Sequence, residues 1–165
     1  MSLRLLVYVL AGIVVVALAL AGVFYVQRGA HMELKGTILK VRTLATGENT
    51  SAVLIDFRCV NAADYPWVVR GVSVALTDSQ GYLVEGATIS DTDAARLFEY
   101  FPLLGQKYND SLTMRTRIPP RQTLDRMIAA RFEIPEAHLR ARQSLRIRVE
   151  EVDGAASEIV EESRE

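Results

Sequence analysis

The feature that most constrains this chain is an apolar run from Leu5 to Val26 that contains no charged side chain. A run of roughly 20 apolar residues is enough for a helix to cross the hydrocarbon core of a bilayer, which is about 30 Å thick. A helix satisfies its own backbone hydrogen bonds, so such a run can leave water. The run predicts a transmembrane signal-anchor helix over residues 1–27, followed by a juxtamembrane linker over residues 28–33.

Two alternatives concern this segment. Residues 19–21 (Ala-Leu-Ala) match a signal-peptide cleavage site, but the apolar run continues to Val26, so we expect it to be retained as an anchor. Arg28 and Lys35 outnumber Arg4, and the positive-inside rule would therefore place the following domain in the cytoplasm. Anchors at the extreme N-terminus commonly precede exported domains, however, and we expect an extracytoplasmic domain.

Alternating apolar residues predict that residues 34–154 form a domain of short strands. Alternation with period two is typical of a strand with one face on a core, and it argues against a parallel α/β sheet, whose strands are apolar on both faces. The sequence Asp78-Ser79-Gln80-Gly81 predicts a hairpin turn. The side chains expected to face the core are Val53, Ile55, Phe57, Cys59, Val72, Val74, Leu76, Ile128, Ala130, Phe132, Ile134, Leu145, Ile147 and Val149.

One or two short helices are expected in the connections between strands. Ser90 with Asp93 three residues later predicts a helix N-terminus, Pro102 predicts its end, and residues 135–142 suit a helical turn. The acidic residues 155–165 are expected to form a frayed tail. The predicted fold class is mainly β: an immunoglobulin-like antiparallel β-sandwich with one or two short helices, preceded by a single N-terminal transmembrane helix.

Three stretches resemble a recurring bacterial pattern: residues 53–61, which end in Asn61, the turn Asp64-Tyr65-Pro66, and residues 72–78 followed by Gly81. They are similar to membrane-anchored immunoglobulin-like domains of the FxLYD and water-stress (late-embryogenesis-abundant-like) type. The resemblance implies a binding or structural module without a catalytic site, and it assigns no functional residue to this chain.

The sequence offers little support for metal binding or catalysis. His31, His138 and the single cysteine, Cys59, lack metal-ligand spacing, so we expect solvated histidines and a buried thiol. Asp91 and Asp93 stand at the start of the expected helix, where carboxylates cap free backbone N–H groups, and capping is preferred over acid–base work or cation binding. We expect no cofactor, no metal and no enzymatic activity.

Arg126, Arg131 and Arg148 are candidates for an anionic patch that would bind lipid headgroups or an acidic partner. The alternative is a solvated sheet face whose arginines pair with the acidic C-terminal segment. No aromatic residues interleave with these arginines, and the net charge of the chain is −1, so nucleic acid is not an expected partner.

Large apolar residues in irregular segments are the best candidates for contact with a partner protein: Trp67, Tyr100, Leu103, Leu104 and Tyr108. The alternative is that such residues cap the core of the sandwich, and Trp67 in particular either closes one end or is an exposed anchor.

These features together predict a non-catalytic, membrane-tethered β-sandwich module that contacts or scaffolds another membrane or envelope protein. A domain that binds or senses a small ligand or anionic lipid headgroups is the alternative, and an enzyme of unknown type is a third option.

Overall fold

The computed structural model describes residues 3–27 and 34–161. The chain divides into two compact units, Met1–Met32 and Glu33–Glu165. The expected linker over residues 28–33, which includes His31, lies outside the described residues.

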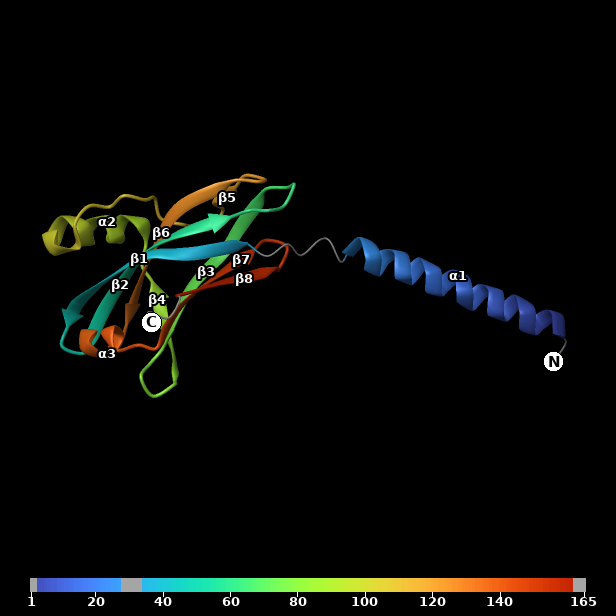
Figure 1. The fold of residues 1–165 in the computed structure, drawn as a ribbon, viewed down its shortest axis with the longest axis horizontal. Helices are drawn as coiled ribbons and strands as arrows, with labels where there is room; N and C mark the ends of the chain where they lie inside the picture. The colour runs from blue at the N-terminus through green and yellow to red at the C-terminus, as the bar shows by residue number, and fades with distance from the viewer. Residues whose placement is uncertain (1–2, 28–33, 162–165) are drawn as a thin grey trace. The chain divides into compact units, whose positions relative to one another are not determined.

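The first unit contains helix α1 (Leu3–Gln27), which has 25 residues (Figure 1). The described side chains of α1 are those of residues 8, 10 and 12–22, and all of them are exposed. Judged on the described part of the chain, no helix is both long and apolar enough to cross a membrane.

The second unit is built mainly of antiparallel strands (Figure 1). Its strands within the described residues are β1 (Lys35–Gly47), β2 (Thr50–Val60), β3 (Trp67–Thr77), β4 (Leu83–Thr88), β5 (Arg117–Ile118), β6 (Thr123–Phe132), β7 (Ser144–Glu151) and β8 (Ala156–Val160). Its helices there are α2 (Asp91–Tyr100), the 3-10 helix η1 (Pro102–Leu104) and α3 (Glu136–Arg140).

A change of partner along β4 curls the sheet into two layers. The strand order is β1-β2-β6-β4-β3-β7-β8, and β5 pairs with β3. Residues 83–86 of β4 pair with β3, whereas Ala87 and Thr88 pair with β6. Gly86 stands at this switch because a Cβ atom there would lie 2.6 Å from Cζ of Phe132. The mainly β, antiparallel sandwich predicted from the sequence is therefore confirmed at this level.

Strand β8 corrects the prediction of a frayed C-terminal tail. Residues 156–160 pair with β7, and the Ile159 side chain is buried in the main core. The buried backbone N–H of Leu34 donates to the Ser157 hydroxyl at 2.7 Å. Only five residues, Ala156 to Val160, form this strand, and acidic residues surround them. The acidic composition therefore predicted a frayed tail where a short strand forms.

The main core lies between the two layers. All the side chains predicted to face inward from β2 and β7 are buried in it, as are Val74, Leu76, Ile128, Ala130 and Phe132. Trp67 also belongs to this core and is 0% exposed. Burial of large apolar side chains such as these supplies the principal driving force for folding.

A second, smaller core covers the outer face of β1, β2 and β6. Leu54, Met127 and Ala129, which point outward from their strands, are buried against Ala94 of α2 and Leu104 of η1. Partly buried Leu97 and Phe98 of α2 extend this packing. The outward face of these strands is therefore covered rather than solvated.

Local signals in the sequence are confirmed at several turns. The Ser90 side chain accepts from the Asp93 N–H and caps α2, and Gly81 adopts φ +92° in the hairpin before β4. Strand β5 is short and covers only Arg117–Ile118.

Candidate functional site

A buried ion pair lies at the centre of the covered sheet face. Arg42 of β1 and Asp56 of β2 are diagonal neighbours on one face, because Arg42 pairs with Leu54, two positions from Asp56. Their side chains are 7% and 6% exposed. An Arg42 guanidinium N–H donates to the Asp56 carboxylate. Charges this far from water persist only when they are paired and hydrogen-bonded, so the pair needs the groups around it.

The segment after α2 supplies those groups. Nη1 of Arg42 donates to the carbonyl oxygens of Leu104 at 3.0 Å and Gln106 at 2.9 Å. The side-chain amide of Asn109 donates to the second carboxylate oxygen of Asp56 at 2.9 Å. Residues 104–109 are therefore attached to the sheet at three points, all of which end on one ion pair.

The ring of Phe98 completes the enclosure. The Arg42 guanidinium carbon lies 4.8 Å from the centroid of this ring, within the range of a cation–π interaction. Phe98 also packs against the second core, so one aromatic side chain shields the charge and ties α2 to the sheet.

The start of α2 is joined to the same segment. The Lys107 ammonium lies 2.6 Å from a carboxylate oxygen of Asp91. The hydrogen bond from Lys107 holds the pKa of Asp91 below its ordinary value. Asp91 and Asp93 lie in the first turn of a helix, as expected. The Ser90 hydroxyl caps the backbone there, and the two carboxylates pair with the Lys107 and Arg96 side chains.

Large apolar side chains point into solvent from this anchored segment. Leu103 is 100% exposed, Tyr100 76%, Tyr108 71% and Phe101 37%. We call the side chains of Tyr100, Phe101, Leu103 and Tyr108 the α2–η1 surface. Leu103 and Tyr108 each adjoin a residue that is hydrogen-bonded to the ion pair, so their backbone is fixed while their side chains stay free.

Two of the predicted contact residues are not available to a partner. Trp67 is 0% exposed because its ring lies in the main core, where Ile118 of β5 pairs with it across the strands. Leu104 is 5% exposed because the turn of η1 points it inward onto Leu54 and Met127. Tyr100, Leu103 and Tyr108 are exposed, as a contact role requires.

The three candidate arginines do not form one patch. Arg126 and Arg131 are five positions apart on β6, so alternation sends their side chains to opposite faces of the sheet. Arg148 lies on β7 in the other layer, where it pairs with Glu150 and Glu158. This pairing with β8 matches the alternative of a solvated, internally neutralised sheet face.

The polar residues considered for chemistry do not converge. Cys59 is buried, and burial raises the pKa of its thiol. His138 is exposed on α3. Within the described residues, no group of three or more His, Cys, Asp or Glu side chains could hold a metal ion.

Sequence reasoning missed Arg42, Asp56 and Asn109, the residues that hold the segment in place. One signal for them exists, because Asp56 is the single acidic residue of β2 and stands directly between the apolar residues Ile55 and Phe57. A carboxylate inside such a strand predicts either a solvated face or a buried partner, and the partner at Arg42 is 14 residues away.

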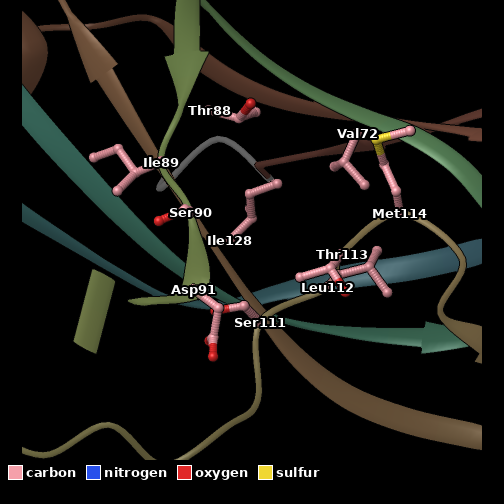
Figure 2. A pocket seen from close by; sticks show the side chains of 10 residues that line it. All are labelled: Val72, Thr88, Ile89, Ser90, Asp91, Ser111, Leu112, Thr113, Met114 and Ile128. Atoms are coloured by element: carbon pink, nitrogen blue, oxygen red, sulfur yellow. The ribbon is translucent and has the colours of Figure 1, made fainter. Parts of the chain in front are cut away.

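A groove of about 440 Å³ opens beside the start of α2 (Figure 2). Figure 2 shows side chains from β3, β6, the β4–α2 connection and the loop after Asp110 around it. Its lining residues are Val72, Thr88, Ile89, Ser90, Asp91, Ser111, Leu112, Thr113, Met114 and Ile128.

No protein-family model matches the chain, and no curated protein matches it. Among solved structures, it is similar to an uncharacterized β-sandwich protein from Clostridium difficile, with 11% identity, a TM-score of 0.40, and coverage of 79% of this chain and 86% of that one. It is also similar to the archaellum periplasmic stator protein FlaG from Sulfolobus acidocaldarius, with 12% identity, a TM-score of 0.37, and coverage of 77% and 98%. A protein from Archaeoglobus fulgidus is 11% identical with a TM-score of 0.40, and the coverage is 76% and 94%.

Proposed function

We propose that this chain is a non-catalytic, membrane-tethered β-sandwich module that binds another membrane or envelope protein through the α2–η1 surface. The observation that carries the proposal is the full exposure of Leu103 beside residues that are pinned to a buried ion pair. Exposed apolar groups on a fixed backbone favour binding, because little conformational entropy remains to be lost when a partner covers them.

The charges around this surface indicate the chemistry of the partner. Residues 91–110 carry four acidic side chains, Asp91, Asp93, Glu99 and Asp110, against two basic ones, Arg96 and Lys107. The resulting charge of −2 opposes binding to anionic lipid headgroups. It favours a protein that presents an apolar groove with a basic rim.

Helix α1 is proposed as the tether. Its 25 residues contain one charged side chain, Arg4. The apolar run from Leu5 to Val26 in the sequence supports this proposal, because roughly 20 such residues match the thickness of a bilayer core. We also propose an extracytoplasmic location and an immunoglobulin-like arrangement of the sandwich. Carbonate extraction of membranes tests the tether, and a topology reporter fused after Glu165 tests the location.

Co-purification from detergent-solubilised membranes tests the contact surface. The triple variant Tyr100→Ala, Leu103→Ala, Tyr108→Ala removes its most exposed side chains. The matched control is Tyr82→Ala, Leu83→Ala, Val152→Ala, which truncates side chains that are 68%, 59% and 56% exposed elsewhere in the same unit.

We expect one protein to co-purify with the wild type and the control, and to be lost by at least tenfold with the triple variant. Equal recovery with all three proteins would contradict the proposal. Flotation with anionic liposomes tests the lipid alternative. If the control variant binds the liposomes and the triple variant does not, the result would favour recognition of lipid headgroups.

A further inference from the structure

The edge of β3 has a gap in its strand pairing. Residues 74–77 of β3 pair with β4, and residues 67–68 pair with β5. Val69 is also bonded at this edge, since its carbonyl accepts from the Arg115 N–H at 2.7 Å. The other edge of β3 is occupied by β7 along residues 69–77. Among the described residues, no strand pairs with residues 70–73 on the β4 side.

Alternation identifies the backbone groups that face this gap. In an antiparallel pair, every second residue directs its N–H and C=O to a given neighbour. The Asp78 N–H donates to the Tyr82 carbonyl at 2.9 Å, so Asp78 belongs to the set that faces β4. Leu76 and Val74 follow in that set, and Val72 is the next member. The N–H and C=O of Val72 therefore point toward the unpaired edge.

The groove of about 440 Å³ lies at the same place (Figure 2). Val72 and Ile128, which pack with the main core, and Leu112 provide its apolar lining. The Met114 side chain lies close to Val72 in Figure 2 and is 70% exposed. An apolar hollow thus adjoins one unpaired donor and one unpaired acceptor of a strand edge.

We propose that this groove binds an extended peptide segment of a partner protein, which adds to the β3 edge through Val72. The backbone of such a segment would exchange two hydrogen bonds with Val72, and one apolar side chain would lie over Val72 and Ile128. Strand addition of this kind takes its affinity from main-chain bonds and its specificity from side-chain pockets.

The side chains that line the groove indicate which type of peptide segment it can bind. Asp91 is the only charged side chain among the described residues that line it. Thr88, Ser111 and Thr113 add hydroxyl groups at its margin. Asp91 is already paired with Lys107, so the groove presents mainly apolar and hydroxyl groups. A segment of alternating apolar and hydroxyl side chains matches this lining, and a strongly acidic segment does not. This binding site is separate from the α2–η1 surface and does not rest on the function proposed for it.

A peptide titration followed by NMR tests the proposal on the full chain in detergent micelles. The probe is an acetylated heptapeptide of alternating valine and threonine with lysine at both ends. We expect chemical-shift changes centred on the Val72 amide and the Ile128 methyl groups. Two further peptides carry N-methyl groups on alternate residues, one at the odd and one at the even positions. One of them should bind at least tenfold more weakly, because a strand directs only every second N–H toward β3.

A substitution at Met114, at the edge of the groove, provides a second test of peptide binding. Met114→Lys places a positive charge, which repels the lysine ends of the peptide, beside the apolar hollow at an exposed position. Val152→Lys is the matched control at another exposed apolar residue. Peptide binding should weaken at least fivefold with the first variant and stay unchanged with the second. Equal binding by both N-methylated peptides, shifts that avoid Val72, or no shifts at millimolar peptide would overturn the proposal.

Discussion

The outer faces of the two sheet layers are built from strands with similar alternating sequences, but one face is covered by helices and the other is exposed to solvent. The outer face of β1, β2 and β6 is covered by α2 and η1, and its ion pair between Arg42 and Asp56 is almost fully buried. The outer face of β7 and β8 is open, and Arg146 and Glu158 pair there with side chains about 40% exposed.

This difference separates charges that organise a segment from charges that only solvate a surface. On the covered face, removal of one partner leaves a charge buried without its counterion, together with carbonyl oxygens that have lost their donor. On the open face, water replaces a lost partner. The covered face therefore fixes the backbone that carries the α2–η1 surface, and the open face fixes no comparable segment.

The largest expected effect is that of Asp56→Ala on the covered face. Loss of the carboxylate leaves Arg42 buried without a counterion and removes the acceptor of Asn109. We expect the free energy of unfolding to fall by about 3–5 kcal/mol. Chemical denaturation monitored by fluorescence of the single tryptophan, Trp67, measures it. Asp125→Ala breaks the exposed pair with Arg58 and should cost less than about 1 kcal/mol; equal losses would erase the distinction.

The second core should contribute almost as much as the ion pair. Leu54 is 0% exposed although it points outward from β2, so Leu54→Ala creates a cavity under α2. A loss of about 2–4 kcal/mol is expected by the same denaturation measurement. Hydrogen exchange should show the backbone amides of α2 opening more readily, while those of β7 keep their protection. A loss below 1 kcal/mol would mean that α2 is only loosely docked.

On the exposed outer face of β7 and β8, loss of an ion pair should have only a small effect on stability. Glu158→Ala removes the partner of Arg146 and Arg148. Because these groups are well exposed, the free energy of unfolding should change by no more than about 1 kcal/mol. Raising the salt concentration to 1 M should shrink this difference further. A loss of several kcal/mol would show that the two faces are energetically alike.

The smallest expected effect is a pH dependence at the start of α2. The pKa of Asp91 is lowered in the folded chain, chiefly by Lys107, so its stabilising contribution is present above the unfolded carboxyl pKa of about 3.9. That contribution is lost as the pH falls through the lower folded pKa. The melting temperature of Asp91→Asn should therefore lie below that of the wild type at pH 6, and the two should converge below about pH 3. A constant difference at all pH values would contradict this linkage.

Much of the main core was predictable from period-two alternation. Alternate residues of β2, namely Val53, Ile55, Phe57 and Cys59, all point into the same core. The covered face was not predictable in the same way. Leu54 and Asp56 lie at the positions that alternation assigns to a solvent-exposed face. Leu54 is buried because α2 and η1 pack over it, and Asp56 because Arg42 and Asn109 bind its carboxylate. Strand β8 was missed because acidic neighbours masked five residues that pair with β7.

The candidate contact segment was found from composition, whereas its geometry depended on the fold. A cluster of aromatic and aliphatic residues between strands identified Tyr100, Leu103 and Tyr108, which are exposed. The same reasoning could not separate Leu103 from Leu104, since neighbouring leucines of a short 3-10 turn differ only in direction. The buried anchor at Arg42 needed long-range contacts that no local pattern encodes.

Photo-crosslinking in intact membranes tests the central claim most directly. A photoreactive amino acid placed at Leu103, which is 100% exposed, is compared with one placed at Tyr82, which is 68% exposed and lies outside the α2–η1 surface. Our account predicts a discrete protein adduct from position 103, lost when Asp56→Ala is added, and none from position 82. Equal adducts from both positions, or no protein adduct from position 103, would contradict it.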